Sequence, residues 1–76
     1  MKLIKDNASA WETYMVEGYP FGIEKIAPRD YVVFRLWGAN RAYGAAGFTS
    51  IKQASDYLTP VVKKYEASII TALVEA

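Results

Sequence analysis

The sequence predicts a small α+β domain in which an antiparallel sheet, built from the first 48 residues, packs against a C-terminal helical segment. Residues 31–37 are rich in β-branched and aromatic side chains, which is typical of a strand. Gly and Pro recur on both sides of this stretch, as in a series of tight turns. From residue 50 to residue 75 apolar side chains recur at helical spacing instead. With 76 residues the chain has room for a single domain, residues 1–76.

The first elements are short. Residues 2–5 fit an edge strand whose lysines discourage pairing with another sheet. Residues 9–17 allow two interpretations, because Ser9 and Glu12 fit the capping box of a helix while the following residues are strand formers. We favour a strand, since residues 18–22 have the composition of a turn and would make the segment part of a meander.

Residues 23–26 form the next expected strand, and residues 27–30 form a turn with Pro in a favoured position. The turn leads into the central strand, residues 31–37. Side chains alternate between the two faces of a strand. One face would carry an apolar set suited to the core, Val32, Phe34 and Leu36, and the other Tyr31, Val33, Arg35 and Trp37.

After a tight reversal at residues 38–40, residues 41–47 are either a strand of small residues or a loop. Glycines within a strand weaken it and mark a place where another group approaches the backbone. Both interpretations leave Arg41 and Tyr43 accessible. We expect a sheet of three or four of these short strands.

The helical half begins at a capping box made by Ser50 and Gln53. One face of this helix would carry Ile51, Ala54 and Leu58, and further apolar residues continue the pattern toward residue 74. Pro60 follows Thr59, a residue suited to an N-cap, so we expect the helical segment to be kinked or broken near Pro60.

The amino-acid composition excludes several kinds of catalytic and metal-binding site. The chain has no Cys and no His, which excludes disulfides, thiolate and imidazole catalysis and the usual zinc sites, so we expect neither a cofactor nor a metal. The carboxylates are scattered along the sequence, and we do not expect an enzyme. No apolar run approaches the ~20 residues that span a bilayer. We expect a cytoplasmic protein without a membrane contact.

The apolar content is high for so small a domain. Hydrophobic residues make up 53% of the chain, and a short chain cannot bury all of them. Surplus apolar surface on a soluble protein usually meets a partner. Charge also gathers in the middle, because residues 25–52 hold five basic residues and one acidic residue. A positive field of this size would steer an acidic partner.

The candidate partner-binding residues are those that combine aromatic and guanidinium groups near the central strand: Tyr31, Arg35, Trp37, Arg41 and Tyr43. Such side chains are enriched where proteins bind other proteins. The opposing interpretation is that another part of the chain covers this face, burying Trp37 while Arg35 reaches solvent. Two further functions stay open: a single-stranded nucleic-acid-binding module, which the lack of a basic stripe disfavours, and a structural homodimer.

The opening stretch 1–5 leads to Tyr14 and Met15, and the stretch 48–50 leads into a helix. On these residues the order of elements resembles that of small phage-encoded anti-CRISPR proteins. The resemblance implies a non-enzymatic inhibitor that occupies a surface of a bacterial defence complex. It assigns no role to any single residue.

Overall fold

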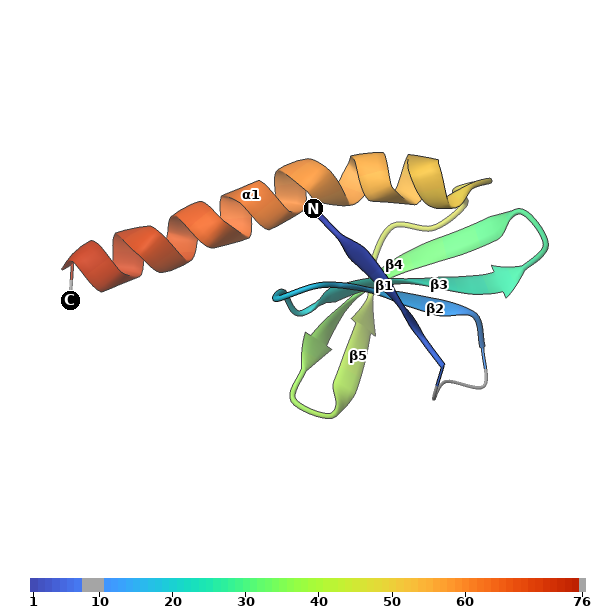
Figure 1. Ribbon diagram of the computed structural model, residues 1–76, viewed down its shortest axis with the longest axis horizontal. Coiled ribbons are helices and arrows are strands. Elements are labelled where there is room, and N and C mark those ends of the chain that lie inside the picture. The colour runs from blue at the N-terminus through green and yellow to red at the C-terminus, as the bar shows by residue number, and fades with distance from the viewer. Residues whose placement is uncertain (8–10, 76) are drawn as a thin grey trace.

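The computed structural model describes the backbone of residues 1–7 and 11–75, with side chains up to residue 69 (Figure 1). Its elements are the strands β1 (Leu3–Asp6), β2 (Thr13–Val16), β3 (Phe21–Ala27), β4 (Asp30–Trp37) and β5 (Asn40–Tyr43), followed by the helix α1 (Ile51–Glu75). The strands form one antiparallel meander in the order β1-β2-β3-β4-β5. The predicted α+β class is confirmed.

The number of strands was underestimated, because the sheet has five strands and not three or four. The uncertain stretch after the central strand divides: residues 40–43 pair with β4, and residues 44–47 are irregular. The strand favoured within residues 9–17 is present as β2, although it is shorter than that stretch. The capping box at Ser9 falls outside the described residues.

Tight turns produce the two longest hairpins. Pro28 and Arg29 alone separate β3 from β4, and Arg29 has a positive φ of 56°. Gly38 and Ala39 separate β4 from β5, and Gly38 has a φ of 60°. A glycine with positive φ at the first position of a two-residue loop suits a type II′ turn, whose twist matches that of paired strands.

Side chains cap the start of α1 as expected. The backbone N–H of Gln53 donates to Oγ of Ser50 at 3.2 Å, and Oε1 of Gln53 accepts from the backbone N–H of Thr49 at 2.8 Å. These bonds satisfy amides that the first turn of a helix leaves unpaired.

The kink or break expected near Pro60 is not confirmed, because α1 is helical without interruption from Ile51 to Glu75. Pro60 removes one hydrogen bond of the helix, to the carbonyl of Asp56. Both residues are exposed, so water can satisfy that carbonyl. The apolar face of α1 meanwhile packs on the sheet and holds the two halves in line.

The core lies between α1 and one face of the sheet. It is built from the expected helix face, with Ala54, Leu58 and Val62 buried, against Ile23 of β3 and Val33 of β4. The covered face of β4 is therefore the one that carries Tyr31 and Val33. The expectation that Val32, Phe34 and Leu36 alone would form the core face is wrong.

The other face of β4 is buried by a different means. Val32 and Phe34 are 6% and 2% exposed, although α1 lies on the opposite side of the sheet. Phe34 is covered by its own sheet: the Tyr43 ring lies 6.0 Å from its ring and the Arg41 guanidinium carbon 4.7 Å. Cross-strand neighbours thus shield this face without a second layer of structure.

α1 is longer than the sheet that it covers. Among the described residues it contacts β3 and β4 and no other strand, and its C-terminal end projects past the strands (Figure 1). The molecule is accordingly elongated, with extents of 44 × 24 × 19 Å. No helix in the described part of the chain is both long and apolar enough to cross a membrane.

Candidate functional site

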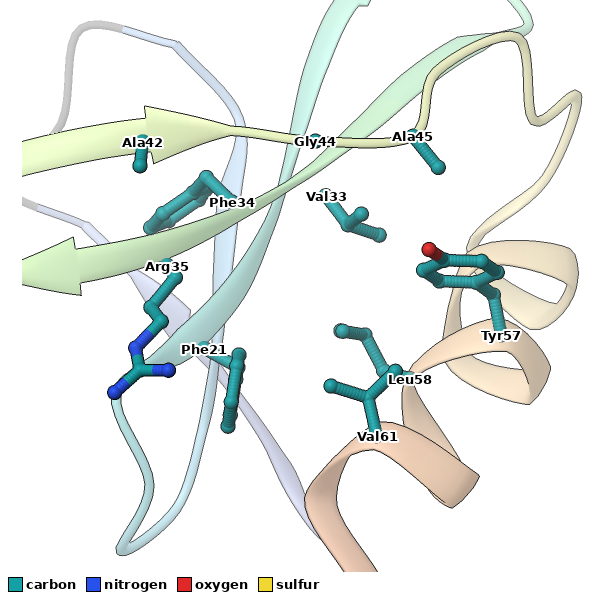
Figure 2. A pocket seen from close by; sticks show the side chains of 10 residues that line it. All are labelled: Phe21, Val33, Phe34, Arg35, Ala42, Gly44, Ala45, Tyr57, Leu58 and Val61. Carbon is teal, nitrogen blue, oxygen red and sulfur yellow. The ribbon is translucent and has the colours of Figure 1, made fainter. Parts of the chain in front are cut away.

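Two neighbouring hollows lie between α1 and the sheet. The first has a volume of about 140 Å³ and the second about 450 Å³. Both are lined by Phe21, Arg35 and Val61, so they meet at these side chains. We call the two hollows together the Arg35 groove. Figure 2 shows the first hollow, with Arg35 and Phe21 at one end and Tyr57 and Ala45 at the other.

Small side chains leave this groove open. On the strand side the first hollow is lined by Ala42, Gly44 and Ala45, which fill little of the space beside α1. On the helix side Tyr57, Leu58 and Val61 point toward the same space (Figure 2). The backbone of α1 lies close to β3 and β4 but not to β5, so the first hollow opens between the helix and β5.

Arg35 is the polar group at the junction. Its guanidinium carbon lies 3.8 Å from the centre of the Trp37 ring, 5.3 Å from that of Tyr65 and 5.7 Å from that of Phe21. These distances are within the range of cation–π contacts. Its Nε atom is buried and has no hydrogen-bond partner. The aromatic rings therefore hold the guanidinium in place without supplying an acceptor.

The groove carries positive charge. The side chains that line its two hollows include Arg35 and Lys64 and no carboxylate. Arg35 takes part in none of the ion pairs found among the described residues. Glu66, also on α1, instead accepts a hydrogen bond from the Tyr19 hydroxyl at 3.0 Å. The site thus combines apolar walls with a cation whose counter-charge is missing from its lining.

The structure separates the five residues that the sequence singled out. Tyr31 belongs to the core under α1, with an exposed fraction of 9%. Arg35 and Trp37 stay together beside the groove, and the Trp37 side chain is 57% exposed. Arg41 and Tyr43 lie on the opposite face of the sheet, next to Phe34. The five do not form one surface.

The opposite face has a hollow of its own, of about 280 Å³, lined by Trp11, Glu24, Ile26 and Tyr43. Trp11 and Tyr43 are more than half exposed at this hollow. The Glu24 carboxylate is buried and lies 3.6 Å from the Arg41 guanidinium. Because this ion pair is already formed within the chain, the hollow offers no uncompensated charge.

Sequence reasoning missed the helix side of the groove. The apolar pattern that continues toward residue 74 includes Val61 and Tyr65, but the residues that they meet on the sheet depend on how the helix packs. Phe21 was assigned to a turn, whereas it opens β3 and lines both hollows. The sequence feature that pointed to the groove was the glycine- and alanine-rich stretch 42–47, because small side chains let another group approach the backbone.

Within the described residues, no group of three or more Asp, Glu, His or Cys side chains could hold a metal ion. Comparison of the chain with known protein families, curated proteins and solved structures found no match.

Proposed function

We propose that this chain is a small non-enzymatic protein-binding module. Its Arg35 groove would receive an apolar segment of another protein, and a carboxylate of that segment would pair with Arg35. Trp37, exposed beside the guanidinium, would supply an aromatic anchor at the rim.

The observation that carries the proposal is the unpartnered Nε of Arg35 at the junction of two hollows. A buried polar group without a hydrogen bond destabilises the free protein by about 1–3 kcal/mol. A carboxylate can accept two parallel hydrogen bonds from a guanidinium, whose face stays stacked on an aromatic ring. A partner with such a carboxylate would therefore supply the counter-charge that the lining of the groove lacks.

The lining of the groove favours a protein segment over single-stranded nucleic acid. Its walls include Phe21, Val61 and Ile69, and it has two cations in all, Arg35 and Lys64. Nucleic-acid grooves instead combine many basic residues along the backbone path with aromatic rings free to stack on bases. Here Trp37 is already stacked on Arg35.

The biological role of such a module would follow from its partner. The resemblance to anti-CRISPR proteins suggests an inhibitor that occupies a surface of a bacterial defence complex, acting in a host cytoplasm. This part of the proposal rests on the order of elements, and the groove supplies the surface with which such an inhibitor would bind.

A random peptide library displayed on phage tests the binding function without knowledge of the partner. The immobilised full chain should enrich peptides with an Asp or Glu flanked by apolar residues. Arg35→Gln should weaken the binding of the enriched peptides by about tenfold or more, the loss of a charge-assisted hydrogen bond. Arg29→Gln is the matched control, because it makes the same change at an exposed turn away from the groove and should leave binding unchanged.

Two results would contradict the proposal. One is the failure of any peptide to be enriched, and the other is equal binding by the wild-type chain and Arg35→Gln. Affinity for an oligothymidine that falls steeply with added salt would favour the nucleic-acid function instead.

A further inference from the structure

We infer that the segment bound by the Arg35 groove adds to the sheet as a sixth strand, along the free edge of β5. This inference rests on the proposed function and specifies how the partner segment binds. The recognition would then combine backbone hydrogen bonds at the edge with side-chain contacts in the groove.

The edge is longer than β5 itself. After Tyr43 the chain continues beside β4: the Gly44 N–H donates to the Val33 carbonyl at 2.9 Å, and Tyr31 forms an isolated bridge with Phe48. The stretch from Asn40 to Phe48 therefore has β4 on one side. Within the described part of the chain no strand pairs with its other side.

The two edges of the sheet differ in their protection. Lys2 and Lys5 lie at β1, and lysines on an edge strand discourage pairing with another strand. Residues 40–48 contain neither Lys nor Pro, and their one charged side chain, Arg41, is directed to Glu24 on the opposite face. The β5 edge thus lacks the lysines that lie at β1.

Gly44 is a glycine that the fold does not require. A Cβ built there would lie 3.7 Å from Cγ2 of Val33, an ordinary contact, and its φ is not in the left-handed region. Gly22 differs, since a Cβ there would overlap Cζ of the Phe34 ring. Gly44 lines the groove, so its missing side chain serves the approach of a second backbone.

The backbone of the edge offers a donor in the right direction. The Gly44 N–H points to β4. Because successive amides of a strand point to opposite sides, the Tyr43 N–H points outward, where it can donate to an added strand.

Arg35 is within reach of that strand. Ala42 lies directly opposite Arg35 in the register of β4 and β5, and its methyl group leaves the way across β5 clear. Two strand spacings place an added strand about 10 Å from β4. A long acidic side chain of the added strand would cross β5 at Ala42 and enter the first hollow, whose lining includes Arg35. Every second side chain of the added strand would face α1, so one carboxylate at such a position can meet Arg35.

The charge beside the edge favours a segment of another protein over a second copy of this chain. A second copy of this chain, pairing β5 with β5, would bring a second Arg35 but no carboxylate to the groove, because the lining of its hollows has none. An extended segment of another protein, with apolar residues and a carboxylate on its helix-facing side, fits the charge and the lining.

The first test uses an enriched peptide bound to the full wild-type chain, N-methylated at one position at a time. Strand addition predicts a period of two: methylation at alternate positions should weaken binding by about tenfold or more, with little effect at the positions between. Because only the peptide is changed, a loss of binding cannot come from misfolding of the protein.

The second test compares two variants at one position. Tyr43→Ala removes the side chain, whereas Tyr43→Pro removes the side chain and the outward N–H. Strand addition predicts that the Pro variant binds the peptide about tenfold more weakly than the Ala variant, with similar thermal unfolding. Gly44→Val should also abolish binding while the domain stays folded.

The outcomes separate the two proposals. Binding that depends on Arg35 but shows no period of two on N-methylation, and equal binding by the two Tyr43 variants, would overturn strand addition and keep the protein-binding function. Peptide binding that does not depend on Arg35 would overturn both. A concentration-dependent dimer lost in Tyr43→Pro but not in Tyr43→Ala would show that the edge receives a second copy and not a partner.

Discussion

The Phe34 ring lies over Gly22 of the neighbouring strand and occupies the space that a side chain at that position would need. A Cβ at Gly22 would stand 2.8 Å from Cε1 of Phe34 and 2.8 Å from the carbonyl oxygen of Tyr14. This contact buries Phe34 on the sheet face that α1 does not cover. Gly22 thus makes room for the Phe34 ring on the sheet face opposite α1.

We predict that Gly22→Ala destabilises the domain by about 1–3 kcal/mol, the usual effect of overpacking. Urea unfolding followed by circular dichroism measures the change. Gly44→Ala is the control and should stay within about 0.5 kcal/mol of the wild-type chain, because a Cβ there makes an ordinary contact. Equal stability of the two variants would contradict the account of Phe34.

Leu58 anchors α1 to the sheet. Its side chain is 2% exposed and belongs to the core cluster with Ile23 and Val33. Leu58→Ala should lower the free energy of unfolding by about 2–5 kcal/mol, which can unfold so small a domain at 37 °C. Ile69→Ala, at a position 42% exposed on the same helix, should have little effect on thermal unfolding. A large loss at Ile69 would mean that the projecting end of α1 is packed in solution.

Arg29 has a backbone conformation that suits glycine better. Its φ of 56° lies in the left-handed region, which costs a residue with a side chain about 1–2 kcal/mol. Arg29→Gly should therefore raise the free energy of unfolding by a fraction of this amount, since glycine also loses more entropy on folding. Arg29→Ala, which removes the side chain and keeps the strain, is the comparison. A Gly variant less stable than the Ala variant would contradict the prediction.

Tyr14 should make stability fall at alkaline pH. Its hydroxyl donates to the Glu12 carboxylate, and this hydrogen bond raises the pKa of Tyr14 to about 12. A tyrosine whose pKa is higher in the folded chain stabilises it fully below pH 10, and the contribution is lost as the pH rises toward 12. In Tyr14→Phe the free energy of unfolding should therefore fall less steeply as the pH rises.

Urea unfolding at several pH values between 8 and 11 checks the slope, and absorbance at 295 nm follows ionisation of the tyrosines. Tyr57→Phe is the control, because it also removes one tyrosine hydroxyl but leaves the hydrogen bond between Tyr14 and Glu12 intact. An unchanged slope in Tyr14→Phe would contradict the role of the hydrogen bond.

Much of the fold could be predicted because its signals are local. The Ser50 cap and the apolar spacing of Ala54 and Leu58 define α1. Pro28 defines the turn before the central strand. Capping, turn formation and periodicity depend on residues close together in the chain, so a single sequence contains them.

The candidate site was less accessible to prediction. Arg35 and Trp37 were chosen correctly as neighbours, since side chains two apart share one face of a strand. Arg41 and Tyr43 were placed with them, but the register of the hairpin sets Arg41 opposite Leu36 and so puts both on the other face. A shift of one residue in the register of the hairpin would move Arg41 and Tyr43 to the opposite face of the sheet.

The sequence by itself determined the α+β class, the central strand, the capped helix and the positive middle of the chain. Only the tertiary structure decided which face of β4 the helix covers, and with it the burial of Tyr31 and the place of Arg35 beside Phe21 and Tyr65. Both faces of that strand carry large apolar side chains, so the local pattern suited either one. The choice depends on packing between segments far apart in the chain, where the long α1 meets β3 and β4 and the small residues after β5 leave the groove open.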